Sequence, residues 1–581
     1  MKIPSVQKVI LELLATLSRF PLEIVSSLCA TIATIELIEI DYDAQTEYRH
    51  FLWRAIWSCM LALPLMLAVS IFGESIKLRT MNRYLLTSAA LLLLVGIYIL
   101  FRPIDWEITF IRFALLFVAF HLIVSFSPFI KDGSVSAFWE FNKRIFLRIL
   151  TAGLYSSVLM GGLSIAILAS DQLFELEISS KIYPKLWVAI LGVFNTSFFL
   201  AGIPKDWDEL QSNVIYPKGL KVFTQYVLIP LATVYVIILL AYEAKISVEW
   251  SLPKGWVSWL ILGYSVYGIL SMLLVFPIRN NEENKWINIY SKWFYILLIP
   301  LLILLAYAVW TRVHAYGITE SRYILVVLAF WLCGITVYFL IGHQNIKIIP
   351  VTLAILALLA TWGPQSAGSI SKLSQYNRLK TYFEQQGSFL NGKLVTLPDT
   401  VKVPDEISSI PEYFVDRYPP TEYSDYFFSN KESSLQTENS YQKRTETLNL
   451  IQSKLGLSST RKTFAINNFT INVKIDSVLT AGYRVMIPIE YHRGRDSHYY
   501  YLSDRESLHI TWNKVVYEYD FSVIFSEFKN QLDESNYFYS EKELALENSE
   551  RNATLIVRSL NYERDGDHMR LLNCSGFLLL K

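Results

Sequence analysis

The chain has 581 residues, of which 53% are hydrophobic and only 18% are charged, and its mean hydropathy is +0.33. This composition is too apolar for a long soluble enzyme. The formal net charge is only +1, so no global basic field exists to attract nucleic acid. No C-x-x-C pair occurs, which excludes a disulfide framework and a thiolate zinc site built on the four cysteines, Cys29, Cys59, Cys333 and Cys574.

Charge divides the chain into two parts. Of the first 370 residues 50 are charged, against 53 of the last 211. Of the 15 tryptophans, 14 precede residue 363, and many flank apolar runs, as rings that seek the headgroup region of a bilayer do. We therefore expect an α-helical polytopic membrane bundle of about 11 transmembrane helices, followed by a C-terminal soluble α+β domain.

The N-terminal segment, residues 1–19, has apolar residues at helical spacing with Lys8 and Glu12 between them. This pattern predicts a helix in the cytoplasm or in the membrane interface. A short lead-in helix without a membrane role is the alternative. No A-x-A cleavage site follows a basic segment, so we expect the first span to be retained.

The transmembrane domain is predicted over residues 20–363. A spanning helix needs about 20 apolar residues, and eleven runs approach that length. They are 20–38, 55–73, 84–101, 110–130, 145–169, 184–203, 222–242, 256–278, 293–311, 323–342 and 346–363.

Basic residues in the short loops predict the orientation. The N-terminus and the even-numbered connections hold 17 Lys and Arg residues, and the odd-numbered connections hold 9. Because cytoplasmic loops carry the excess, we expect the N-terminus in the cytoplasm. After an odd number of spans the C-terminal domain then lies outside the cytoplasm, and one miscounted span inverts that side.

A helix and a proline-rich linker are predicted over residues 371–436. Leu373, Tyr376, Leu379 and Phe383 repeat at helical spacing, and Gly387 ends the pattern. Five prolines follow between residues 398 and 420, which predicts an extended linker or a strap lying on the surface.

The soluble α+β domain is predicted over residues 437–581. A polar helix near 437–455 precedes several β-like runs, and a helix is expected at 521–532. The last two runs predict an antiparallel hairpin around Asp565-Gly566. The runs are 463–473, 483–491, 498–502, 508–520, 553–564 and 568–580.

Three stretches carry a resemblance to known sequences. They are Tyr216–Lys221 running into Leu228-Ile229-Pro230, then Arg312–Tyr323, and then Ser371–Leu379. Over roughly residues 20–390 the chain resembles a family of uncharacterised bacterial multi-pass membrane proteins, domain of unknown function 4153. The resemblance implies an envelope location and a multi-pass topology, and it implies no activity, ligand or cofactor.

A candidate polar site lies in the connection before the tenth span. Arg312, Tyr316, Glu320 and Arg322 fall within eleven residues, on the predicted side of the soluble part. Two guanidinium groups can grip a carboxylate or a phosphate, so this connection could dock the soluble domain or bind an anionic group. The alternative is a helix-capping turn at Gly317.

Ionisable residues inside spans are a second set of candidates. Such residues are costly in a bilayer and suggest function by default. Glu23 lies in the first span, and Arg112 and His121 lie in the fourth. A proton path through Glu23 and His121 is one interpretation, and a structural hydrogen bond for His121 is the other.

No sequence motif fixes a reaction, since phosphate-binding loops, zinc-protease motifs and serine-hydrolase motifs are all missing. We favour a non-enzymatic inner-membrane protein whose extracytoplasmic domain binds an envelope protein or a small-molecule ligand, besides the lipid bilayer, and couples that event to the bundle. No cofactor, metal or nucleic acid is expected. The alternatives are a secondary transporter, suggested by Pro230 and Pro300 in similar apolar segments, and a transferase acting on lipid-linked substrates, with Asp41 and Asp43 as its first candidates.

Overall fold

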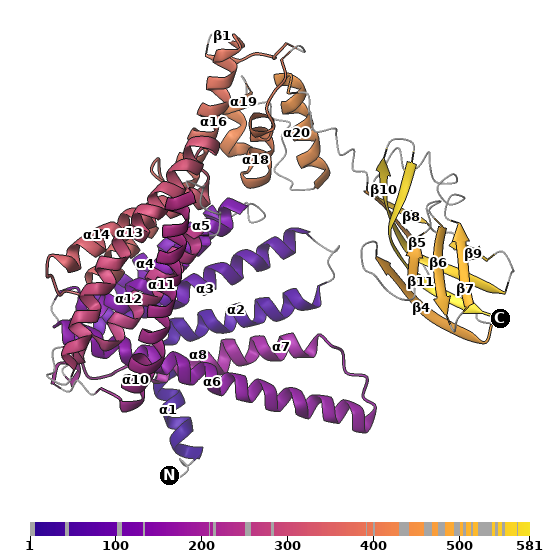
Figure 1. The fold of residues 1–581 in the computed structure, drawn as a ribbon. Helices are drawn as coiled ribbons and strands as arrows, with labels where there is room; N and C mark the ends of the chain where they lie inside the picture. The colour runs from indigo at the N-terminus through magenta and orange to yellow at the C-terminus, as the bar shows by residue number, and fades with distance from the viewer. Residues whose placement is uncertain are drawn as a thin grey trace. The chain divides into compact units, whose positions relative to one another are not determined.

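The chain forms two compact units, Met1–Leu457 and Ser458–Lys581, in the computed structural model (Figure 1). The structure describes residues 6–40, 46–101, 107–131, 134–207, 209–212, 216–249, 257–279, 284–390, 392–398, 401–428, 441–457, 468–473, 483–492, 500–502, 507–512, 515–520, 537–540, 544–548, 552–565 and 568–581.

The first unit is a polytopic helical membrane bundle. Over the described residues, ten helices are long and apolar enough to cross a membrane. They match the first ten apolar runs, which confirms the predicted fold class. These crossing helices span Pro21–Glu39, Glu47–Ser75, Thr80–Leu100, Glu107–Phe129, Val135–Phe174, Ile182–Ala201, Lys218–Glu249, Val257–Ile278, Trp286–Tyr316 and Glu320–Leu340.

Some crossings consist of several pieces joined by widened or tightened turns. A π turn at Thr224–Leu228 comes directly before Pro230, whose missing amide hydrogen interrupts the helical bonding. The elements are α1 Val6–Arg19, α2 Pro21–Glu39, α3 Thr46–Ser75, α4 Thr80–Leu100, α5 Glu107–Phe126, α6 Val135–Phe174, α7 Ile182–Ala189, α8 Thr196–Ala201, α9 Glu209–Ser212, α10 Lys218–Phe223, α11 Ile229–Glu249, α12 Val257–Val275, α13 Lys285–Tyr316 and α14 Glu320–Leu340.

Buried and exposed apolar side chains fall on different faces of the crossing helices. Helices α11 to α14 pack around one apolar cluster, in which Ile261, Leu298 and Leu301 are fully buried. Large apolar side chains such as Leu92 of α4 and Ile165 of α6 are instead exposed. Lipid tails solvate such faces, so exposure of this kind is stable only in a bilayer.

The eleventh predicted run corresponds to α15, Ile348–Thr361, which is only 14 residues long. Its length is about 21 Å, short of the roughly 30 Å of a bilayer core. The Trp331 indole donates to the Thr352 hydroxyl at 2.9 Å, and the Tyr323 hydroxyl donates to the Gln365 carbonyl at 2.6 Å. Helix α15 therefore runs antiparallel to α14, and by Gln365 the chain has returned to the end of the bundle where α14 begins.

A small helical layer follows α15, and we call residues 367–457 the helical cap. Its proline-rich part differs from the extended linker that we expected, because the prolines begin helices. Pro404 and Pro419 precede helices, and Pro411 and Pro420 lie in first turns, where the missing amide hydrogen costs nothing. The cap contains α16 Ala367–Gln385, β1 Phe389–Leu390, β2 Lys393–Leu394, α17 Asp405–Ser408, α18 Ile410–Arg417, α19 Pro420–Phe427 and α20 Tyr441–Leu455.

The cap has its own aromatic core. Phe383 of α16 and Phe414 of α18 are fully buried in it, and Ile108 from the first turn of α5 enters the same cluster. Leu379 is also buried, as the predicted periodicity requires, but Leu373 is 49% exposed and faces away from the core. The cap is therefore attached to the bundle by apolar packing as well as by the polar contacts described below.

The cap and α1 lie at opposite ends of the bundle (Figure 1). At the α1 end, Arg19 pairs with Glu74 at 2.7 Å and donates to the carbonyls of Ile203 and Pro204. These partners belong to the second and sixth connections, and the cap contacts the third and ninth. Even and odd connections are therefore separated as a multi-pass topology requires.

The second unit is formed by β-strands. Strands β10 and β11 pair antiparallel from Ala553 opposite Leu580 to Asp565 opposite His568, which confirms the predicted hairpin. The run expected over 508–520 is two strands, because β6 and β7 pair antiparallel with Trp512 opposite Val515. The helix expected at 521–532 lies outside the described residues.

The strands of this unit form two sheets. The larger has the order β4-β11-β10-β3-β8, with β9 also paired to β10, and the smaller has the order β5-β6-β7. All described pairs are antiparallel except β3 with β8. The strands are β3 Asn468–Val473, β4 Val485–His492, β5 Tyr500–Leu502, β6 Ser507–Trp512, β7 Val515–Asp520, β8 Tyr537–Ser540, β9 Leu544–Glu547, β10 Ala553–Asp565 and β11 His568–Leu580.

Candidate functional site

Glu320 is a buried carboxylate in the first turn of α14, with 1% of its surface exposed. The Tyr413 hydroxyl donates to it at 2.7 Å, the Tyr418 hydroxyl donates to the same oxygen, and the Arg417 guanidinium donates to the other oxygen at 3.1 Å. A buried charge is tolerated only with such partners. The positive end of the α14 dipole adds to the stabilisation, so α18 and the start of α14 form one electrostatic unit.

The two tyrosines act as hydrogen-bond donors in this unit. Burial raises the pKa of Tyr413 and Tyr418, and the negative charge of Glu320 raises both further. Both phenols therefore stay protonated at neutral pH.

Arg417 joins two crossing helices at once. The same Nη1 atom that contacts Glu320 lies 2.9 Å from Oε1 of Glu107 in the first turn of α5. Glu107 is half exposed, whereas Glu320 is buried. One guanidinium from α18 therefore connects the starts of α5 and α14.

A second, partly buried carboxylate, Glu422 of α19, joins α5 and α16. Both Nη atoms of Arg112 donate to its two oxygens, at 3.0 and 3.2 Å, and Lys372 Nζ donates at 2.7 Å. A bidentate pair of this kind, with two parallel N–H···O hydrogen bonds, is the strongest geometry for an Arg–carboxylate interaction. Burial raises the pKa of Glu422, but Arg112 and Lys372 outweigh it and hold that pKa below its usual value. We call Glu320, Glu422 and their donors the cap joint; the donors are Arg112, Lys372, Tyr413, Arg417 and Tyr418.

The turn between α13 and α14 is fixed by α16. The Ile318 amide donates to the Ser374 hydroxyl at 2.9 Å, and the Gln375 side chain donates to the Tyr316 and Ile318 carbonyls. Gly317 has φ of 69° and ψ of −179°, a backbone region that only glycine adopts readily. A Cβ atom at Gly317 would lie 2.5 Å from Cδ of Arg378, so this turn requires glycine for two reasons.

The four residues of the predicted polar site do not share one role. Glu320 belongs to the cap joint, while Arg322 donates to the Tyr316 and Gly317 carbonyls and lies over the Tyr316 ring. Arg312 is half-buried, and no carboxylate of the described residues pairs with it. The structure thus brings this connection against α16 and α18 of the cap.

The predicted intramembrane residues lie in different surroundings. Arg112 faces Glu422 of the cap. Glu23 is buried between α2 and α3, where Ser70 donates to one of its oxygens at 2.7 Å. Its other oxygen has no hydrogen-bond partner within the described part of the chain. His121 is exposed on α5, packs against the Phe117 ring at a tilt and contacts the carbonyl of that residue. No described contact links Glu23 with His121.

Sequence reasoning missed the cap side of the joint. Tyr413, Arg417, Tyr418 and Glu422 lie in the segment that we expected to be extended, and Lys372 was not singled out. The available signal was a proline followed within two residues by Glu at Pro411 and again at Pro420, which is typical of a helix start. Even that signal does not reveal which distant cation or carboxylate each residue meets.

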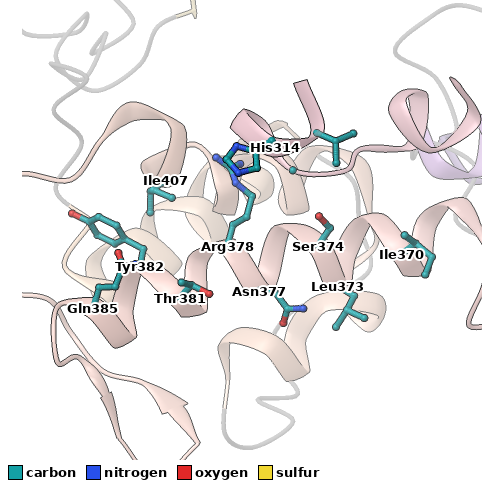
Figure 2. Close-up of a pocket in the computed structure, with 12 residues that line it drawn as sticks. His314, Ile370, Leu373, Ser374, Asn377, Arg378, Thr381, Tyr382, Gln385 and Ile407 are labelled. Carbon is teal, nitrogen blue, oxygen red and sulfur yellow. The ribbon is translucent and has the colours of Figure 1, made fainter. Parts of the chain in front are cut away.

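An open groove runs along the face of α16 beside the end of α13 (Figure 2). Its volume is about 610 Å³. Ile370 and Leu373 line the part next to the first turn of α16. Most side chains farther along this helix are polar, and apolar Ile407 of α17 lies near Tyr382 (Figure 2). The lining residues are Val313, His314, Gly317, Ile370, Leu373, Ser374, Asn377, Arg378, Thr381, Tyr382, Gln385 and Ile407.

The described residues support neither a metal site nor a transferase site. Among those residues, no group of three or more His, Cys, Asp or Glu side chains is placed to hold a metal ion. Asp41 and Asp43, the first candidates for a transferase, lie outside the described residues.

These features define the class as a multi-pass membrane protein with a helical cap joined to one end of its bundle. The family described as "Domain of unknown function (DUF4153)" matches residues 30–392, and the chain belongs to it. Its similarity to the uncharacterized protein PM1469 of Pasteurella multocida (strain Pm70) is 25% identity over 327 residues, 54% of each chain. The chain thus spans about half the length of that curated relative. No solved structure gives a significant match.

We predict that the cap loosens at acidic pH because Glu422 becomes protonated. A carboxyl with a depressed pKa in the folded state stabilises the fold above its ordinary pKa, here 4.5, and this stabilisation is lost as the pH falls through the lower folded value. Hydrogen exchange in α19, corrected for the intrinsic rate at each pH, should accelerate below about pH 4.5.

The matched variant is Glu422→Gln, which leaves Arg112 and Lys372 without their counter-charge. It should cost roughly 2 kcal/mol at neutral pH, less than a fully buried pair because Glu422 is partly exposed. In this variant, hydrogen exchange in α19 should also no longer accelerate as the pH is lowered. An unchanged step in the variant would assign the pH effect to another group.

We also predict that Gly317→Ala opens the turn between α13 and α14. The backbone strain alone should cost about 1–3 kcal/mol, and the new Cβ displaces Arg378. Exchange at Ile318 and in the first two turns of α16 should accelerate about tenfold or more. Gly334→Ala in α14 is the control, because no atom lies within 4 Å of its Cβ position. Equal exchange in both variants would show that the turn tolerates alanine.

Proposed function

We propose that this protein is a bacterial inner-membrane protein whose extracytoplasmic part binds a partner or ligand and couples that binding to the helical bundle. The cap joint is the observation that carries the proposal. Its two carboxylates, buried Glu320 and partly buried Glu422, fix the cap to the first turns of α5 and α14, and Ile108 of α5 lies in the cap core. A displacement of the cap must therefore break these ion pairs or move both helices.

The geometry of the joint favours a two-state response. Arg417 contacts a buried carboxylate of α14 and a half-exposed one of α5, so it can exchange partners without becoming desolvated and unpaired. Packed interfaces of this kind change between discrete arrangements and do not deform continuously. We infer that ligand binding selects one arrangement of the cap on the bundle.

The second unit also has an exposed apolar surface. Trp512, Val515 and Val516 at the β6–β7 end are all more than 40% exposed. Trp is common in the centres of protein interfaces, because it buries a large area with little loss of side-chain entropy. We propose this hairpin as the contact surface for an envelope partner.

A secondary transporter with a soluble gating or capture domain is the second candidate. Glu23 supports it, because one of its oxygens is buried inside the bundle and has no hydrogen-bond partner among the residues that the structure describes. A carboxyl in such a place is a functional hypothesis by default. The cap would then gate a path through the bundle.

The orientation is tested by reporter fusions, for which α15 supplies a matched pair. The excess of Lys and Arg in the even connections supports a cytoplasmic N-terminus and a periplasmic cap. Green fluorescent protein fused after Gly342 should fluoresce, and alkaline phosphatase fused after Gln386 or Lys581 should be active. If the reporters at Gly342 and Gln386 indicate the same side of the membrane, α15 does not cross it. If phosphatase is active at Gly342 but not at Gln386, the orientation of the protein is the reverse of the one we propose.

The coupling is tested by Glu320→Gln in the full chain in lipid nanodiscs. Glutamine keeps an acceptor for the two tyrosines and removes the charge that Arg417 contacts. We expect hydrogen exchange to change about threefold at the opposite end of the bundle, around Arg19 and Glu74, as an energetic coupling of roughly 0.7 kcal/mol would produce.

The control for this experiment is Glu406→Gln, which removes a cap carboxylate that is exposed and 3.8 Å from Arg378. It should leave the far end unchanged, since exposed pairs contribute little. If Glu320→Gln alters exchange only in the cap and in the first turns of α5 and α14, the joint is a local anchor and the coupling proposal fails.

A further inference from the structure

The groove beside α16 has a graded polarity along its length. Ile370 and Leu373 lie near the first turn of α16, and Asn377, Thr381 and Gln385 follow at successive turns (Figure 2). Leu373 is 49% exposed, whereas Leu379 and Phe383 of the same helix are buried in the cap core. Over 19 residues the helix rises about 28 Å. The groove therefore leads from an apolar end beside the bundle to a hydroxyl- and amide-lined end.

Basic side chains gather in the middle of the groove, between its apolar end and its polar end. The side chain of Arg378 lies beside His314 in the groove (Figure 2). Arg312 and Arg378 both lie close enough to Arg322 to repel its charge. Burial lowers the pKa of Arg378, and the one nearby carboxylate is that of exposed Glu406, at 3.8 Å. Among the described residues, none of these three guanidinium groups has a buried counter-ion.

The groove opens at the depth of the membrane surface. Trp310 is 63% exposed in the last turns of α13, and its ring packs against His314. Tyr316 at the end of α13 is also exposed. Exposed Trp and Tyr side chains at the end of a spanning helix mark the headgroup region of a bilayer. Leu373 and Ile370 are therefore within reach of lipid tails, and Arg378 is within reach of headgroups.

We propose that this groove binds an anionic glycerophospholipid of the surrounding membrane. The phosphate contacts Arg378 and His314, the polar headgroup lies along Asn377 and Thr381, and the acyl chains leave past Leu373 into the bilayer. Arg378 can serve two partners, because its Nη atoms already hold the Ala315 and Tyr316 carbonyls while Nε has no described partner. The assignment needs only the groove, so it stands or fails separately from the coupling function.

Lipid retention tests this assignment. The full chain is purified from nanodiscs that contain phosphatidylglycerol and phosphatidylcholine, is delipidated stepwise, and its bound lipids are counted by native mass spectrometry. We expect phosphatidylglycerol to be retained preferentially. Arg378→Gln should weaken that retention about tenfold, the effect of losing one charge-assisted hydrogen bond. Lys380→Gln is the matched control, a cation on the same helix outside the groove that pairs with Glu384.

A second variant separates lipid binding from a structural role of Arg378. Thr381→Trp fills the groove and leaves the contacts of Arg378 with α13 in place, so it should lower phosphatidylglycerol retention while exchange in α13 stays unchanged. Equal retention of the two lipids, or wild-type retention in both groove variants, overturns the proposal. Displacement of the lipid by millimolar glycerol phosphate would assign the groove to a soluble phosphate ligand and would also overturn it.

Discussion

The burial of Glu320 is the constraint on which the arrangement of the cap depends. A carboxylate that is withdrawn from water at the start of a membrane helix is stable only if donors surround it. The sequence around Glu320 supplies no such donors in its own turn, since Arg322 is committed to the carbonyls of Tyr316 and Gly317. The donors have to come from a distant segment. Helix α18 provides Tyr413 and Arg417, and Tyr418 directly after it provides the third donor. The cap is held over this end of the bundle because Glu320 must be satisfied there.

The two carboxylates of the cap joint differ in how their charges are stabilised. Glu422 has two cations and lies in a partly exposed position, so its charge is over-compensated and its pKa is depressed. Glu320 is more deeply buried and shares Arg417 with Glu107, so two phenolic hydrogen bonds stabilise its charge together with the shared guanidinium. An interface with one strong pair and one shared pair can change at the shared pair first. That asymmetry is the physical basis for a response that begins at α18 and α14.

Hydrophobicity predicted the bundle because the bilayer imposes length and polarity on each span independently of its neighbours. All eleven predicted runs are helical, and the alternating pattern of β10 and β11 with Asp565-Gly566 was enough to predict a hairpin. The cap was not predictable in this way. Pro404, Pro411, Pro419 and Pro420 are compatible with a linker or with helix starts, and only the packing of Phe414 and Tyr418 into a core decides between the two. The contacts of Glu320 with residues about 100 positions later carry no local signal at all.

The short helix α15 explains how a charged joint can exist at the membrane surface. A longer α15 would place Ser366 beyond the first turn of α14, and Lys372 and Gln375 would then miss Glu422 and the turn at Gly317. With 14 residues it packs along α5 and ends early, and residues 362–366 complete the return with the Gln365 carbonyl bonded to Tyr323. The Ser366 hydroxyl then accepts the Ser369 amide and starts α16 at the level of Glu320. The length of one apolar helix therefore sets the register of the ion pairs that fix the cap to the bundle.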